Sequence, residues 1–196
     1  MRITLASQSS ARRALLAGAG VAHEATVSGV DEDELKARML LAGDGPAAIA
    51  QALADAKALA VSSLRDGLVI GADQTLDLEG RLHDKAESRE AARERLRTLR
   101  GRAHALHSAV SLARDGAVIW RETVSARLVM RPFSDAFLET YLDAEGEAAL
   151  GSVGCYRLES LGVQLFEAIE GDYFTILGLP MTGLLARLRA EGALAA

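Results

Sequence analysis

The sequence predicts an α/β protein built on a mixed β-sheet flanked by helices. A short apolar run, Ile3–Ala6, precedes a helical pattern over Arg12–Gly18, the order typical of a strand that leads into a helix. Residues 104–113 and 117–130 are two strand-like runs that flank the turn Arg114–Gly116, which indicates a hairpin. Strands joined by helices and strands joined by a hairpin in one chain indicate a mixed sheet rather than a pure βαβ series.

The first half of the chain alternates between the two kinds of element. Residues 25–30 are expected to form a strand that ends in the acidic loop Asp31–Glu34. Pro46 can open a helix. In that helix Ile49, Leu53 and Lys57 follow at a spacing of four, which places Lys57 near its buried edge.

A second apolar strand is expected at Leu68–Ile70, ending at Gly71-Ala72-Asp73. Residues 75–82 are predicted to form a hairpin that turns at Glu79-Gly80, and residues 88–99 an amphipathic helix with exposed arginines. Asp73 would thus lie at the end of a strand, the usual place of ligand sites in open α/β sheets.

The second half of the chain also mixes strands and helices. Residues 117–130 alternate between apolar and polar side chains, as a half-buried antiparallel strand does. The remaining expectations are a helix from Ser134 to Leu142, a glycine-rich loop over 151–162, strands at 163–169 and 173–177, and a last helix opened by Pro180.

Composition limits the class of protein. The 196 residues suit a single domain of two lobes, residues 1–196, and 49% hydrophobic residues supply a core. A net charge of -5 argues against binding to a nucleic acid polymer, which needs a basic surface. No apolar run reaches the ~18 residues of a membrane span, the polar residues 7–13 interrupt any signal sequence, and Cys155 is the single cysteine. We therefore expect a cytoplasmic protein that contacts no membrane.

The turn after the first strand is a candidate anion site. Ser7, Ser9 and Ser10 precede a helix whose first turn carries Arg12 and Arg13. Cations are poorly placed at a helix N-terminus, and a bound anion would remove that conflict. Hydroxyls, free N–H groups and guanidinium groups all donate to phosphate oxygens. The alternative is an ordinary capped surface helix with solvated arginines.

Two further kinds of side chain could complete a phosphate site. Lysine stands only at positions 36, 57 and 85 among 22 basic residues, so Lys57 and Lys85 are candidates for a compact positive charge. Glu32 and Asp73 are candidate carboxylates, and magnesium takes one or two carboxylates together with substrate phosphates. Each residue alone also suits a solvated surface or a turn.

Several other chemistries lack their motifs. The chain has neither a Walker A sequence nor G-x-G-x-x-G, and it has no G-x-S-x-G elbow. The four histidines do not follow a metal-ligand spacing.

A set of short motifs follows in order along nearly the whole chain. The first is Leu5-Ala6-Ser7-x-Ser9 with Arg12-Arg13. The others are Val30-Asp31-Glu32, Ala56-Lys57-Ala58, Gly71-Ala72-Asp73, Lys85, Leu99-Arg100-Gly101, Ile169-Glu170-Gly171-Asp172-Tyr173 and Leu177-Gly178-Leu179-Pro180. Together they resemble the Maf family of nucleoside triphosphate pyrophosphatases, whose opening signature is L-A-S-x-S-P-R-R.

The resemblance implies a two-lobed fold with a central cleft, related to inosine-triphosphate pyrophosphatases. It implies hydrolysis of a nucleoside triphosphate to the monophosphate and pyrophosphate, a divalent metal (Mg²⁺ or Mn²⁺) and a homodimer. Asp73 matches the family's proton acceptor and Glu32 a carboxylate that helps to hold the metal, beside Lys85. Ser7, Arg12, Arg13 and Lys57 are then expected to bind the phosphates.

Three departures from the family pattern leave an alternative open. Ser10 and Ala86 replace prolines, and Leu150–Gly154 replaces a K-A-G segment. A nucleotide-binding regulator of cell division with weak or vestigial hydrolysis is therefore the second hypothesis.

The preferred base is a separate question. Gln74, Glu159 and Leu165-Phe166-Glu167 resemble the branch that acts on 7-methyl-GTP, whereas the dTTP/UTP branch typically has Thr and Gln at the first two positions. An acidic Glu159 suits a cationic methylated guanine. Ala11 lacks the large side chain often found in the 7-methyl-GTP branch, which leaves a dTTP/UTP preference as the alternative.

Overall fold

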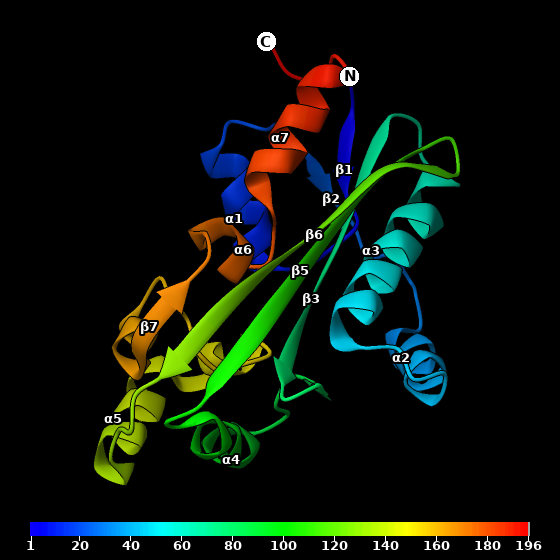
Figure 1. The fold of residues 1–196 in the computed structure, drawn as a ribbon. Helices are drawn as coiled ribbons and strands as arrows, with labels where there is room; N and C mark the ends of the chain where they lie inside the picture. Colours follow the sequence, from blue (N-terminus) through cyan, green and yellow to red (C-terminus); the bar gives the residue numbers. More distant parts are fainter. Residues whose placement is uncertain (196) are drawn as a thin grey trace.

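The computed structural model describes residues 1–195, and within them seven strands form one mixed sheet (Figure 1). The strand order is β2-β1-β3-β5-β6-β7, and β4 pairs with β3 outside this path. β1 is parallel to β2 and β3, whereas β3, β5, β6 and β7 are antiparallel neighbours. The strands span Ile3–Leu5, Glu24–Ala25, Leu68–Leu78, Arg81–His83, Ala103–Arg114, Ala117–Met130 and Phe166–Glu170, from β1 to β7. The predicted α/β class with a mixed sheet is confirmed.

Helices cover both faces of the long strands. Figure 1 shows α3 on one side of β3, β5 and β6, and α1, α6 and α7 on the other, with α4 and α5 at the lower end. The helices α1 to α7 span Ser10–Gly18, Glu32–Leu41, Pro46–Ser62, Arg89–Leu99, Asp135–Glu145, Tyr173–Ile176 and Met181–Ala190. Two 3-10 segments, η1 (Gly146–Gly151) and η2 (Leu161–Leu165), follow α5.

The core has two main parts, one toward each end of the long strands. Leu76 of β3 belongs to the cluster that packs on α4 and α5, and Ile70 of the same strand to the cluster that packs on α1 and α7. β5 divides in the same way, with Leu106 in the first cluster and Leu112 in the second. One sheet therefore runs through both parts of the core.

Helix α3 lies very close to β3. A Cβ at Gly71 would be 2.1 Å from the Ala54 carbonyl oxygen and 2.6 Å from the Ala58 nitrogen, so the helix backbone occupies the space that a side chain would need. This close contact brings Lys57 of α3 against Asp73 of β3. Lys57 is only 6% exposed, as the spacing of apolar residues in this helix predicts.

The acidic segment after β2 is a helix, not the predicted loop. Asp31 is the N-cap of α2, and its Oδ1 accepts a hydrogen bond of 2.9 Å from the Glu34 backbone nitrogen. The acidic side chains of the first turn also interact favourably with the helix dipole. None of the residues of α2 is buried, which explains why its sequence shows no apolar period. β2 is also shorter than the predicted strand over 25–30.

Asp73 does not end a strand. β3 continues unbroken to Leu78, because residues Val69 to Asp77 pair with β5. Asp73 therefore lies in the middle of β3, beyond the last residue that pairs with β1. The expected hairpin consists only of the end of β3 and the short β4.

The region before the last helix also differs from the prediction. Residues 173–176 form the single turn α6 rather than a strand, because Asp172 caps it through a hydrogen bond of 2.9 Å from the Thr175 nitrogen to Oδ1. Residues 161–165 are 3-10 helix, so the strand predicted over 163–169 begins only at Phe166. The hairpin at Arg114–Gly116 and the helices after Ser88, Ser134 and Pro180 are confirmed.

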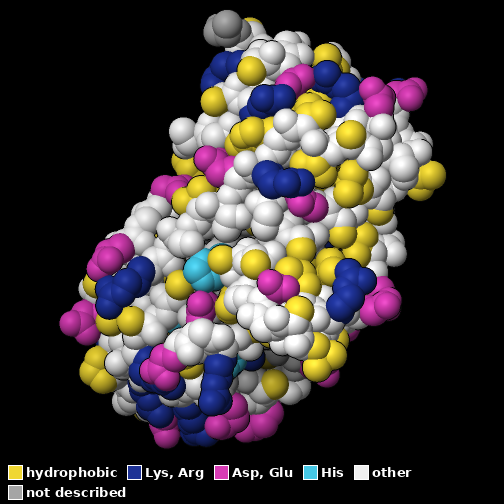
Figure 2. All heavy atoms as spheres, turned by 45° about the vertical axis from the view of Figure 1, so that its right-hand side comes forward, with side chains coloured by type: hydrophobic (Ala, Val, Ile, Leu, Met, Phe, Trp, Pro, Cys, Tyr) yellow, Lys and Arg dark blue, Asp and Glu magenta, His cyan; other side chains and the backbone are white. Residues whose placement is uncertain are grey.

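The arginines of α4 are engaged by acidic side chains. Arg89 pairs with Glu139 and Asp143 of α5, and Arg93 with Glu139. Figure 2 shows basic and acidic side chains intermixed at this lower end of the molecule. This end of the molecule therefore offers no uniform basic surface to a polyanion. Among the residues that the structure describes, no helix is both long and apolar enough to cross a membrane.

Candidate functional site

A large cavity opens beside the middle of β3. Its volume is about 1050 Å³, and its lining comes from the turn before α1, from α2 and α3, from β3, from the segment after β4, from residues 151–159 and from the end of α6. The walls thus include elements from both halves of the core. Every predicted site residue except Arg13 belongs to this lining.

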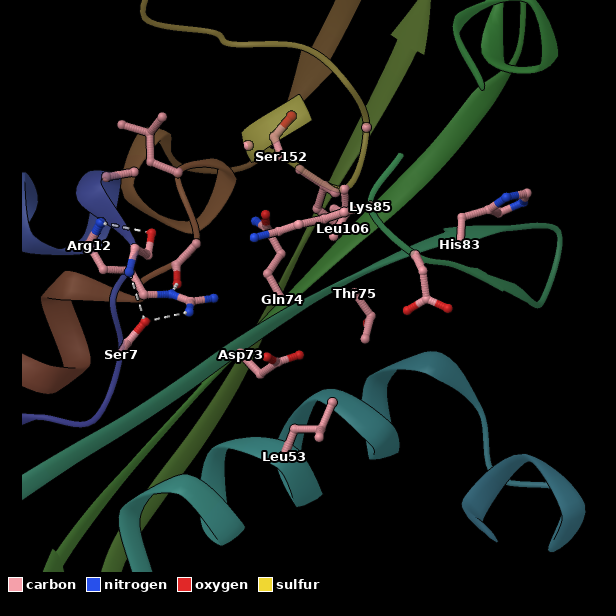
Figure 3. Close-up of a pocket in the computed structure, with 18 of the residues that line it drawn as sticks. Ser7, Arg12, Leu53, Asp73, Gln74, Thr75, His83, Lys85, Leu106 and Ser152 are labelled. Carbon is pink, nitrogen blue, oxygen red and sulfur yellow. Dashed lines mark hydrogen bonds between the residues drawn. The ribbon is translucent and has the colours of Figure 1, made fainter. Parts of the chain in front are cut away.

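The turn after β1 is arranged around Arg12. The Nε of Arg12 donates to the Gly178 carbonyl oxygen at 2.8 Å, and its Nη1 donates to the Ser7 Oγ at 3.2 Å (Figure 3). Neither partner is charged, so the guanidinium keeps its full positive charge for a ligand. Burial lowers the pKa of Arg12, and the negative charges of Asp73 and Glu32 oppose that shift.

Arg13 lies apart from the site. It is exposed and is not among the lining residues of the cavity. Consecutive residues of a helix point about 100° apart, and here Arg12 lines the cleft whereas Arg13 is exposed to solvent. The sequence places the two arginines side by side but does not show which of them points inward.

The two candidate carboxylates meet at one ammonium group. The Nζ of Lys57 lies 2.6 Å from Oδ1 of Asp73 and 2.9 Å from Oε1 of Glu32. Asp73 is 8% exposed, and Glu32, the first residue of α2, is partly exposed. The helix α3 therefore brings together two acidic groups from distant parts of the chain.

Lys85 extends into the cavity from the segment after β4. Figure 3 shows its side chain reaching across the cavity above Gln74. Partial burial in the cleft and the nearby Arg12 lower the pKa of Lys85, although the charges of Asp73 and Glu32 act in the opposite direction. Within residues 1–195 its ammonium has no ion-pair partner, which leaves it available to an anion.

The lowered pKa of Lys85 predicts an alkaline limit to anion binding. A lysine with a lowered pKa loses its positive charge at a pH below its usual 10.5, so binding of a phosphate ligand will weaken as the pH rises through that lower value. We expect kcat/KM for a triphosphate to fall in this range. Lys85→Arg will move the fall to higher pH, because a guanidinium stays charged. A pH profile that is identical in both proteins would contradict this assignment.

Gln74 and Glu159 lie in the same cavity but are held differently. The Nε2 of Gln74 donates to the Thr175 and Ile176 carbonyl oxygens, each at 3.0 Å, and to the Ser108 Oγ at 2.9 Å. Its orientation is therefore fixed by α6. Glu159 is exposed and pairs with Arg157 at 3.2 Å, so one of its oxygens is already engaged.

The structure adds two residues that the sequence did not assign to the site. Lys36 of α2 lines the cavity and pairs with Asp84 at 2.8 Å, so all three lysines of the chain lie at this site. The scarcity of lysine was the signal that could have indicated Lys36. The second added residue is Gly178, whose φ is +93° and whose carbonyl oxygen accepts a hydrogen bond from Arg12. Gly178 belongs to the motif Leu177-Gly178-Leu179-Pro180, but its contact with Arg12 follows only from the fold.

The donor set suits a divalent cation that arrives with a phosphate ligand. Within residues 1–195 there is no group of three or more His, Cys, Asp or Glu side chains that could hold a metal alone. Glu32 and Asp73 supply two carboxylates, and Mg²⁺ is commonly bound by one or two carboxylates together with substrate phosphates.

Among the described residues, the cleft combines two cations without carboxylate partners, Arg12 and Lys85, with two carboxylates that converge on Lys57. Such a cleft beside an α/β sheet defines the class of proteins that bind and process polyphosphates. The chain belongs to the Maf-like protein family, whose model matches residues 2–191. It is 64% identical to a nucleoside triphosphate pyrophosphatase of Caulobacter vibrioides, over 98% of this chain and 96% of that protein. It is 50% identical to a 7-methyl-GTP pyrophosphatase of Rhizobium meliloti (98% and 97% covered) and 45% to one of Brucella abortus (97% and 96% covered). The predicted family and enzyme class are confirmed.

Proposed function

We propose that this cavity hydrolyses nucleoside triphosphates to the monophosphate and pyrophosphate. The observation that carries the proposal is the juxtaposition of Arg12 and Lys85, which have no carboxylate partner within residues 1–195, with a carboxylate pair around Lys57. Unpaired cations at the edge of a cavity attract a polyanion, and the carboxylates offer a base beside it. The names of the relatives support the same reaction.

The side chains divide the work between binding and proton transfer. Arg12, Lys85 and Lys57 neutralise the triphosphate, and the Ser7 hydroxyl adds a hydrogen bond. Within residues 1–195 no hydrogen bond engages Oδ2 of Asp73, so this oxygen can orient a water molecule and accept its proton. The water oxygen bonds to phosphorus, the α–β phosphoanhydride bond breaks, and pyrophosphate leaves. Positioning and electrostatic stabilisation dominate such reactions, so no covalent intermediate is needed.

Glu32 and Asp73 would hold a divalent metal, Mg²⁺ or Mn²⁺, together with the phosphates. A bound divalent metal supplies positive charge to the phosphate oxygens and acts as a Lewis acid. Glu32, being partly exposed at the start of α2, is the more accessible of the two ligands.

The nucleobase of the preferred substrate is proposed to be a modified purine such as 7-methylguanine. This nucleobase would contact the segment 151–159, of which Tyr156 and Glu159 line the cavity. Glu159 would then face a cationic ring, whereas Gln74 offers its carbonyl oxygen from an orientation fixed by α6.

Glu159→Gln tests this preference. We expect the variant to lose kcat/KM for 7-methyl-GTP about ten- to a hundredfold relative to GTP, UTP and dTTP, because a hydrogen bond to a charged group contributes ~1.5–3 kcal/mol. The measurement is the ratio of kcat/KM values for the four substrates in both proteins.

Glu145→Gln is a matched control for this prediction. Glu145 pairs with the same Arg157, at 3.2 Å, but it is not a lining residue of the cavity. It should leave the substrate ratios unchanged even if it lowers stability. Equal ratios in wild type and Glu159→Gln would instead mean that Glu159 serves only the loop around Arg157 and has no role in base specificity.

The proposed reaction itself is tested by incubating the purified protein with a nucleoside triphosphate and measuring both products. We expect monophosphate and pyrophosphate in equal amounts. Tight binding of nucleotide without release would favour the regulator of cell division instead. The homodimer, the cytoplasmic location and the lack of nucleic acid binding stay predictions.

A further inference from the structure

Lys57 occupies the place between the two carboxylates. Its Nζ is within hydrogen-bonding distance of Oδ1 of Asp73 (2.6 Å) and of Oε1 of Glu32 (2.9 Å). The side chain is 6% exposed and rises from the middle of α3, which packs directly on β3. The ammonium therefore cannot leave for bulk solvent, and any movement has to take place within the cavity that it lines.

The same two oxygens are the ones that a divalent cation would need. An ammonium and a metal ion both require negative oxygens at close range, so they compete for Glu32 and Asp73. Without Lys57, two carboxylates would face each other in a partly buried site, where like charges repel and a cation is strongly attracted. With Lys57 present, that attraction is already satisfied.

A bound triphosphate can end the competition between Lys57 and the metal for the two carboxylates. Arg12 and Lys85 have no carboxylate partner within residues 1–195 and lie in the same cavity, so they can bind a polyphosphate chain first. The phosphate oxygens then offer Lys57 a new anionic partner and also supply the metal ligands that two carboxylates alone do not provide.

We infer that Lys57 is an internal counter-cation that keeps Glu32 and Asp73 free of divalent metal until a nucleotide arrives, so that the species bound is the metal–triphosphate complex. This inference rests on the proposed function. It assigns Lys57 two partners in turn: the carboxylate pair in the free protein, and a phosphate in the complex.

The test is Mn²⁺ binding to the protein without nucleotide, measured from the EPR signal of free Mn²⁺ and by calorimetry. We expect weak binding to wild type and at least about tenfold tighter binding to Lys57→Met, because the competing charge has been removed. Lys57→Gln, which keeps a donor for the two carboxylates, should also bind Mn²⁺ more tightly and covers the case in which Lys57→Met does not fold. Adding Glu32→Gln to either variant should restore weak binding.

Lys85→Met is the matched control. It removes the same charge from the same cavity. Within residues 1–195 Lys85 makes no ion pair with Glu32 or Asp73 and acts on them only through space, whereas Lys57 contacts both, so the effect of Lys85→Met on Mn²⁺ binding should be less than about threefold. Tight Mn²⁺ binding by wild type, or equal affinities in the Lys57 and Lys85 variants, would overturn the inference. Assaying pyrophosphate release by wild type separates the two proposals: an active protein with no effect at Lys57 rejects this inference alone, whereas an inactive protein rejects the proposed function.

Discussion

Replacing Asp73 with Asn is expected to leave the protein folded and to lower kcat for pyrophosphate release by about 10²- to 10⁴-fold. The amide has nearly the same shape but cannot accept a proton from water, and general base catalysis contributes an effect of this size. The Lys57 ammonium would still find an amide oxygen at the position of Oδ1, which stands 2.6 Å from Nζ. Steady-state kinetics with a triphosphate, together with far-UV circular dichroism and urea unfolding, measure both parts of the expectation.

Asp77→Asn is the control for this change. Asp77 lies four residues further along β3 and faces the same side of the sheet, but it contacts His107 and the Gly80 nitrogen and does not line the cavity. Loss of the Asp77 carboxylate should lower only the stability of the fold, and we expect kcat within about twofold of wild type. An Asp73→Asn protein that releases pyrophosphate at a near-normal rate would remove Asp73 from the reaction.

Arg12→Met is expected to lower kcat/KM for every triphosphate by roughly ten- to a hundredfold. The guanidinium is fixed by the Gly178 carbonyl and the Ser7 hydroxyl, so its charge is already oriented toward the cavity. A charge-assisted hydrogen bond contributes ~1.5–3 kcal/mol, and the loss applies to all bases because the triphosphate is common to them. Rates at low substrate concentration for a purine and a pyrimidine nucleotide provide the measurement.

Arg13→Met makes the same chemical change one residue later. Because Arg13 is exposed and lies outside the cavity lining, we expect kcat/KM close to that of wild type. If the two variants lose activity equally, the phosphates extend beyond the cavity to the exposed face of α1. If Arg12→Met is fully active, the turn before α1 is not the phosphate site.

Local chemistry in the sequence is enough to predict several parts of the site. The spacing of Ile49, Leu53 and Lys57 indicates that this lysine is buried, and the structure has it 6% exposed. The hydroxyls and arginines of the first turn indicate an anion site at the start of α1, where Arg12 and Ser7 do face the cavity. Serines before a helical pattern also mark the caps of α4 and α5.

The wrong predictions fall where contacts distant in sequence decide the structure. β3 extends through Asp73 because β5 pairs with it along nine residues, which no local pattern around Gly71 reveals. Tyr173–Ile176 has the composition of a strand, but it forms a helical turn that Asp172 caps. A carbonyl oxygen of this turn accepts a hydrogen bond from the Gln74 side chain. The ion pair of Lys57 with Glu32 joins residues 25 positions apart and depends on how α2 lies beside α3.

Product identification with wild-type protein tests the proposed reaction most directly. Purified protein is incubated with Mg²⁺ or Mn²⁺ and 7-methyl-GTP, GTP, UTP or dTTP, and the products are followed by ³¹P NMR. We predict nucleoside monophosphate and pyrophosphate in equal amounts, with 7-methyl-GTP the best substrate. Release of nucleoside diphosphate and inorganic phosphate, or tight binding of nucleotide with no cleavage, would contradict the proposed function.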